Sequence, residues 1–129
     1  MKHYRILIVI AGIGAFVAMG MGLPYHKERN LKVLPKDISD AKLDSIMDSY
    51  TVALGVKCNF CHVPVKQGSD SLDFVSDSDP MKENARGMMK MVIDVNKNYF
   101  YFDKNTRPEY LNVINCNTCH RGEPIPKEK

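Results

Sequence analysis

The first feature of the hydropathy pattern is an unbroken apolar run at the N-terminus. Residues 6–23 carry no charge and follow Lys2 and Arg5. The run exceeds the apolar core of a signal peptide, about 7–15 residues, and is just long enough to span a bilayer as a helix. A basic flank before such a helix keeps the N-terminus in the cytoplasm. We therefore predict a signal-anchor or transmembrane helix at residues 1–23, in the cytoplasmic (inner) membrane, with the rest of the chain in the periplasm. A cleaved signal peptide is the alternative, since small residues at 18–20 resemble a cleavage site.

After this run the pattern becomes helical. Residues 24–35 are polar and bounded by prolines, which predicts a linker, and residues 36–129 form the folded domain. Ser39 is a good helix N-cap and Gly55 a natural helix end. Between them, apolar residues recur every three or four positions, as on one face of a helix: Leu43, Ile46, Met47, Tyr50 and Leu54.

A second helix is predicted at residues 80–100. Asp79 and Pro80 supply a cap and a proline at the first helical position. An apolar stripe follows at helical spacing: Met81, Ala85, Met88, Val92, Val95 and Tyr99. The segment between the two helices shows no strand pattern and is predicted as a loop. The fold class is thus mostly α, with long loops.

All four cysteines lie in two copies of one motif, C-x-x-C-H. The copies are Cys58, Cys61 and His62, and Cys116, Cys119 and His120. This is the attachment signature of c-type haem. Cysteines three residues apart on a helical turn face the same way, so both thiols can bond one porphyrin, and the histidine reaches its iron. The sequence therefore predicts two covalently attached haem c groups.

Other uses of paired cysteines are less consistent with the sequence. A zinc site of four thiolates leaves both histidines unexplained, and the pairs lie farther apart than in usual zinc sites. Two disulfides are possible outside the cytoplasm, and a thioredoxin-like redox motif requires an α/β scaffold that the pattern does not predict.

The sixth iron ligand decides the function. Methionine is a soft ligand that raises the potential and makes an electron-transfer centre. Met47 lies on the helix that ends just before the first motif, where core packing is the alternative role. Of the three methionines in the second helix, Met88 is central to the apolar stripe, Met91 is the reserve, and Met89 is predicted to pack. We expect His26 of the linker to be a surface residue.

These units resemble the multihaem cytochrome subunit of bacterial photosynthetic reaction centres. "MDSYTVALGVKCNFCH" and "ARGMMKMVIDVNKNYF" followed by "CNTCHRG" match that family's helix-and-motif unit over about residues 34–126. There, a methionine on the preceding helix is the distal ligand, which implies Met47 for the first iron and Met88 for the second. The photosynthetic members carry more haem motifs, so this chain resembles their short two-haem relatives.

Charge and composition narrow the function further. The formal charge of +3 includes Lys2 and Arg5, and no basic stripe with interleaved aromatics is present, so we predict no nucleic-acid partner. We predict a membrane-anchored dihaem cytochrome c that transfers single electrons and is not itself an enzyme. Its expected partners are redox proteins, as a subunit or partner of a larger membrane redox complex. The alternatives are a small peroxidase-like dihaem enzyme with one open iron and a zinc-stabilised interaction module.

Overall fold

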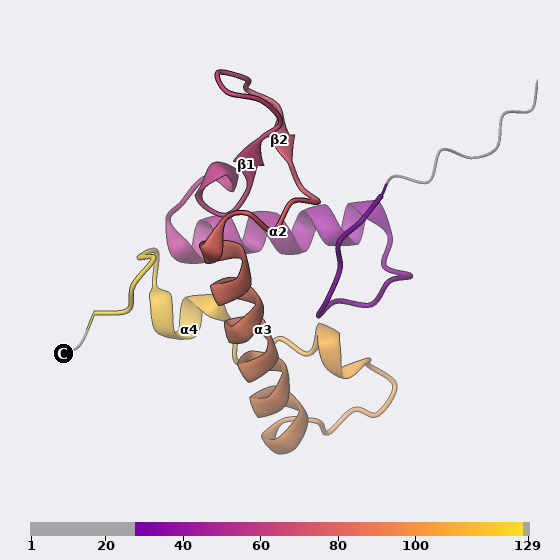
Figure 1. Ribbon diagram of the computed structural model, residues 1–129. Helices are drawn as coiled ribbons and strands as arrows, with labels where there is room; N and C mark the ends of the chain where they lie inside the picture. The colour runs from indigo at the N-terminus through magenta and orange to yellow at the C-terminus, as the bar shows by residue number, and fades with distance from the viewer. Residues whose placement is uncertain (1–27, 128–129) are drawn as a thin grey trace, which may run out of the picture.

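The computed structural model describes residues 28–127, so the helix predicted at 1–23 lies outside the described residues. The described chain forms the helices α2 (Asp40–Leu54), α3 (Pro80–Tyr99) and α4 (Cys116–His120), with short 3-10 turns η1 (Cys58–Phe60) and η2 (Pro108–Tyr110). Figure 1 shows α3 crossing in front of α2, with α4 beside the C-terminal end of α2. Among residues 28–127, no helix is long and apolar enough to cross a membrane.

Helix α2 has the ends that its sequence predicts. The Ser39 hydroxyl accepts a hydrogen bond from the Lys42 amide at 3.3 Å, which satisfies one free donor of the first turn. At the other end Gly55 adopts the left-handed conformation, with φ +62°, and its amide returns to the last turn of the helix. Both predicted boundaries are confirmed.

Helix α3 also begins as predicted, but it buries a polar face. The Asp79 carboxylate accepts from the Met81 amide at 2.8 Å, and Pro80 is the first helical residue. The buried side chains of α3 are Lys82, Arg86 and Asn96. Residues of the apolar stripe stay open instead: Met88 is 51% exposed and Tyr99 70%. Within residues 28–127 the polypeptide therefore leaves this apolar surface partly uncovered.

The prediction that residues 56–79 contain no strand is wrong. Strands β1 (Val63–Pro64) and β2 (Leu72–Asp73) pair antiparallel as a small hairpin. Each strand has two residues, too few to produce the alternation that marks a strand in sequence. The hairpin is extended by a bond from the Val65 amide to the Ser71 carbonyl at 2.9 Å.

The described part of the predicted linker packs on the domain. The Asn30 amide group donates to the Val75 carbonyl at 2.7 Å, and Leu34 is buried. In the described chain, the buried apolar residues are only Leu34, Ile38 and Ala53. A chain of this length normally needs a larger core or another body to complete one. The described residues alone therefore form only a small apolar core.

Candidate functional site

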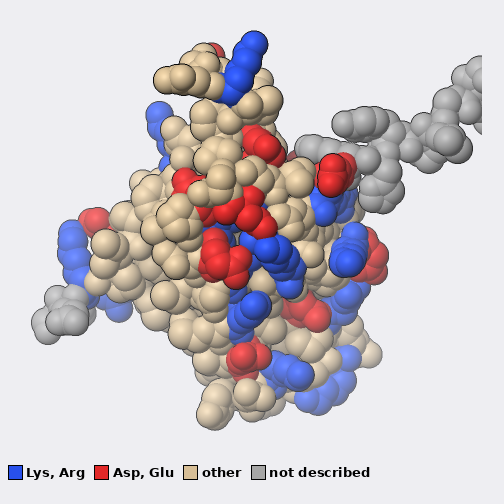
Figure 2. Space-filling model, in the orientation of Figure 1, with Lys and Arg blue, Asp and Glu red and all other residues tan. Residues whose placement is uncertain are grey.

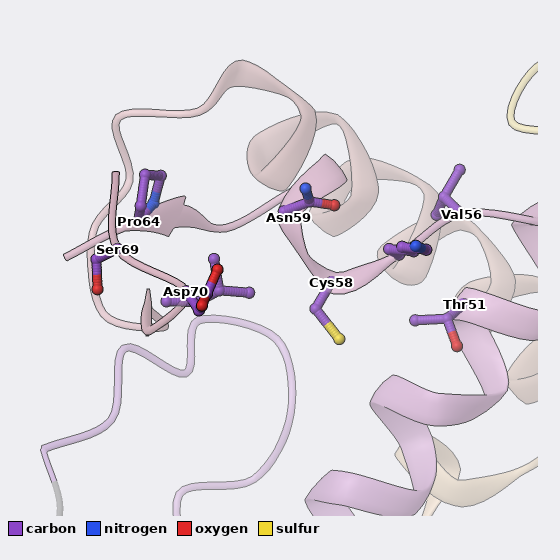
Figure 3. A pocket seen from close by; sticks show the side chains of 9 residues that line it. Thr51, Val56, Cys58, Asn59, Pro64, Ser69 and Asp70 are labelled. Atoms are coloured by element: carbon purple, nitrogen blue, oxygen red, sulfur yellow. The ribbon is translucent and has the colours of Figure 1, made fainter. Parts of the chain in front are cut away.

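The first C-x-x-C-H motif forms a tight turn at η1. The Cys58 carbonyl accepts from the amides of Cys61 at 3.3 Å and His62 at 3.1 Å, which closes the turn that carries the motif. A cavity of about 540 Å³ borders Cys58. Figure 3 shows the Cys58 sulfur pointing into the space between Thr51 on α2 and Asp70 of the hairpin loop. The first motif thus presents the Cys58 thiol to a hollow between α2 and the hairpin.

His62 sits in a partly buried environment beside this turn. Its ring packs edge-on against Phe74, with 5.0 Å between ring centroids. Burial lowers the pKa of His62, and the nearby positive charges of Lys82 and Arg86 lower it further. A lowered pKa keeps the imidazole neutral at pH 7, which is the form that binds a metal. Its Nδ1 is buried without a hydrogen-bond partner in the described structure.

The second motif is a one-turn helix, α4. Asn115 and Thr118 form a capping box at its start, and the hydroxyl of Thr118 accepts from the Asn115 amide at 3.1 Å. The Nδ1 atom of His120 lies 3.0 Å from the Glu123 carbonyl oxygen. Because a carbonyl can only accept, Nδ1 carries the proton and Nε2 keeps its lone pair. This is the arrangement by which proteins orient a metal-binding histidine.

The turn after His120 is locked to the end of α2. The Gly122 amide donates to the Ala53 carbonyl at 2.9 Å. A side-chain carbon at Gly55 would lie 2.1 Å from the Gly122 carbonyl oxygen. Only glycine permits this approach, and its positive φ also favours glycine. The helix that leads into the first motif therefore packs against the second.

Asn96 fixes the approach to the second motif from the other side. It is 0% exposed, and its amide group donates to the carbonyls of Leu111 at 3.2 Å and Ile114 at 2.7 Å. Its oxygen accepts from the Ile114 amide at 2.9 Å. These three bonds hold the backbone just before Cys116 against helix α3. This role of Asn96 could not be predicted from the sequence, because a single asparagine in a helix has no distinguishing pattern.

A second cavity, of about 610 Å³, borders Cys116. It lies among α2, α3 and α4, and its lining includes Ile46, Tyr50, Met89, Val92 and Cys116. Burial is the main cause that raises the pKa of Tyr50, and burial likewise raises that of Cys116. Both groups are therefore neutral at pH 7. The lining of the cavity combines apolar side chains, such as Ile46 and Val92, with polar ones, such as Ser45 and Asp48.

The predicted methionine ligands can be placed relative to these cavities. Met47 lies one helical turn before Thr51, which lines the Cys58 cavity, so both are on the same flank of α2. Met88 lies one turn before Val92, which lines the Cys116 cavity. Met89, predicted to pack, itself lines that cavity. Iron ligation by Met47 and Met88 stays a prediction, and Met89 is the direct rival for the second site.

The residues at both motifs fit covalently attached haem. All four cysteines are free thiols, as thioether formation requires. Among residues 28–127, no group of three or more His, Cys, Asp or Glu side chains is placed to hold a metal ion, so the geometry offers no four-thiolate zinc site. Both cavities fall in the range of about 300–1,000 Å³ typical of ligand sites. Each borders a cysteine of one motif.

Comparison with known proteins agrees with this chemistry. The family model described as photosynthetic reaction centre cytochrome C subunit matches residues 22–129. Cytochrome c-554 of Chloroflexus aurantiacus is 34% identical over 101 residues, which cover 78% of this chain and 22% of that protein. No solved structure matches the chain.

Two reaction-centre proteins give similar alignments. The photosynthetic reaction center cytochrome c subunits of Thermochromatium tepidum and Roseobacter denitrificans are 32% and 31% identical, over 77% of this chain in each case. The aligned part spans 22% and 25% of those two proteins, so the chain matches about a quarter of the length of these curated relatives. The chain belongs to the family of photosynthetic reaction centre cytochrome c subunits.

Proposed function

We propose that the chain is a membrane-anchored dihaem cytochrome c that passes single electrons on the periplasmic face of the cytoplasmic membrane. The observation that carries the proposal is the pair of C-x-x-C-H turns, each with free thiols and each bordering a cavity. Two such turns in a domain of this size would hold two centres close together, which supports a role in electron transfer between them.

The roles of the residues follow from their chemistry. Cys58 and Cys61 hold one group covalently and His62 is the proximal ligand, with Met47 as the distal one. A covalently bound haem supplies an iron that takes up and releases one electron. The thioethers keep the cofactor on a chain too small to enclose it.

The second site uses the same set of side chains. Cys116 and Cys119 attach the group, His120 is the proximal ligand, and Met88 is the distal one. The Glu123 carbonyl holds the His120 ring in one tautomer. Asn96 and the Gly122 turn hold the motif between α3 and α2, which limits movement of the ligands. A rigid ligand set is suited to electron transfer, since little has to move when the charge changes.

The membrane and partner parts of the proposal rest on sequence and kinship. The basic flank and apolar run of residues 1–23 favour an anchor. Two relatives are named as cytochrome c subunits of a photosynthetic reaction center, which is a complex of several subunits. We infer that this chain is a subunit or partner of a larger membrane redox complex, without carrying over a photosynthetic role.

A spectroelectrochemical titration of the full chain purified from membranes tests the proposal. We expect two one-electron transitions and a reduced spectrum that does not change with carbon monoxide, because both irons have two protein ligands. A carbon-monoxide-sensitive haem in the native protein would favour the peroxidase-like alternative. The Met47→Ala variant should create that sensitivity at one haem only.

A further inference from the structure

Two buried basic side chains lie close to the proximal histidine of the first site. Lys82 and Arg86, one turn apart on α3, are 8% and 6% exposed. Buried cations are uncommon in proteins unless they are paired, so this pair needs an explanation. Figure 2 shows acidic and basic side chains gathered where the start of α3 meets the hairpin.

The pair is held rigidly. The Lys82 ammonium group donates to three consecutive backbone carbonyls, those of Phe74, Val75 and Ser76, at 2.9, 3.2 and 2.6 Å. The Arg86 guanidinium lies 2.8 Å from an Asp77 oxygen and donates to the Asn30 carbonyl at 3.0 Å. Neither side chain can turn away to reach solvent without losing these contacts. Both charges are therefore fixed in place.

Phe74 connects the lysine to the first site. Its ring packs on the His62 ring, with centroids 5.0 Å apart, and its carbonyl accepts from Lys82 at 2.9 Å. A single residue, Phe74, thus contacts both the Lys82 ammonium group and the His62 ring.

Negative charges near the pair oppose its positive charge only in part. Asp77 pairs with both cations, at 3.4 Å from Lys82 and 2.8 Å from Arg86, and Glu83 pairs with Arg86. The side chains of Asp77 and Glu83 are 36% and 64% exposed, so water screens them more than the buried cations. Lys32 is the main cause that holds the pKa of Asp77 well below its ordinary value. The Lys32 side chain, which is 51% exposed, lies 2.7 Å from an Asp77 oxygen and so shares this carboxylate with the buried cations.

Two other carboxylates, those of Asp79 and Asp73, lie near His62 and oppose the two cations. Asp79 accepts from the Met81 amide, and Asp73 from the amides of Val75 and Ser76. These amide dipoles compensate part of each negative charge.

The second site has a different environment. His120 donates to the Glu123 carbonyl, which makes an imidazole a stronger electron donor to iron. In the described structure the ion pair nearest in sequence to His120 is Lys127–Glu123, whose side chains are 76% and 48% exposed. Such an exposed pair produces little field in the interior.

We propose that Lys82 and Arg86 raise the reduction potential of the first haem above that of the second, so that the first haem is the electron acceptor within the pair. Reduction removes one positive charge from the iron, and a fixed positive charge nearby stabilises the reduced form. The inference rests on the proposed dihaem function. It adds a direction of electron transfer, from the second site to the first, and names the residues that set it.

The test is a redox titration of the full-length dihaem protein and its Lys82→Met variant. We expect the higher-potential transition to move down while the other stays in place. Lys82→Arg, which keeps the charge, should restore the native value. Lys90→Met removes a charge from an exposed position of the same helix and should move neither transition. Should Lys82→Met not fold, Arg86→Gln carries the same expectation.

The double variant Cys116→Ser, Cys119→Ser assigns each transition to one of the two haems. It should retain only the first haem and show the higher potential. The inference would be overturned if Lys82→Met left both transitions unchanged or shifted them equally. A lower potential for the haem retained in the cysteine variant would also overturn it. A native protein without two one-electron transitions would instead refute the proposed function, which separates the two failures.

Discussion

The contact between Gly55 and Gly122 gives the sharpest prediction, because it links a residue beside the first motif to the second site. In Gly55→Ala the new methyl group would meet the Gly122 carbonyl oxygen at 2.1 Å and its carbon at 3.0 Å. Backbone atoms cannot move aside as a flexible side chain would. We expect the turn that follows His120 to be pushed off the end of α2.

The cost has two parts. A side chain in the left-handed conformation costs about 1–2 kcal/mol, and Gly55 has φ +62°. Displacement of Gly122 also breaks its 2.9 Å hydrogen bond to Ala53, worth about 0.5–1.5 kcal/mol. The expected loss of unfolding free energy is therefore about 1.5–3.5 kcal/mol. Chemical denaturation of the haem-loaded protein measures it.

A second readout tests the link between the sites. The displaced turn carries Glu123, whose carbonyl orients His120, so the second haem's spectrum should change although the substitution is close to the first. Gly68→Ala is the matched control, since Gly68 has φ +78° but no atom within 4 Å of the new carbon. Gly68→Ala should lower the unfolding free energy only by the cost of the left-handed conformation. Equal costs for the two variants, with both haem spectra unchanged, would refute the reasoning.

Three further predictions concern ligation, positioning and pH. Met88→Ala should make the second haem bind carbon monoxide on reduction, whereas Met89→Ala should not; the reverse result would transfer the ligand role to the methionine that lines the Cys116 cavity. Asn96→Leu leaves buried partners unpaired, at about 1–3 kcal/mol each, and should lower stability in denaturation far more than Asn98→Leu at an exposed site. The pKa of Asp77 lies below its ordinary value of 3.8, so its stabilising effect is complete above that pH and is lost as pH falls through the lowered value. Acid unfolding of Asp77→Asn should therefore begin from a lower stability at neutral pH and show a shallower decline; an unchanged acid profile would contradict this.

The parts of the fold that depend on neighbouring residues in the sequence could be predicted. Ser39 and Asp79 are helix caps because a side-chain oxygen next to the first turn can reach its free amides, and both caps are present. Gly55 ends α2 for an equally local reason. The cysteine and histidine residues were identified by spacing alone, since one turn of chain sets their common direction.

The remaining features depend on contacts between distant segments. The buried face of α3 is polar because Lys82 and Arg86 find partners in residues 30 and 74–77, which no periodicity indicates. Asn96 acquires its role only when the segment before Cys116 lies against it. The apolar stripe that periodicity identified is real, but residues 28–127 leave Met88 half exposed rather than burying it. In a chain of this kind, an apolar stripe can indicate a cofactor surface instead of a protein core.

The central claim is that each motif carries a covalent haem. Intact-mass analysis of the full chain from its native membrane, followed by peptide mapping, tests it most directly. We predict a mass increase of two haems over the polypeptide, with one haem on the peptide of Cys58 and Cys61 and one on that of Cys116 and Cys119. A protein with no haem, with one, or with disulfides or zinc at these cysteines would contradict the account.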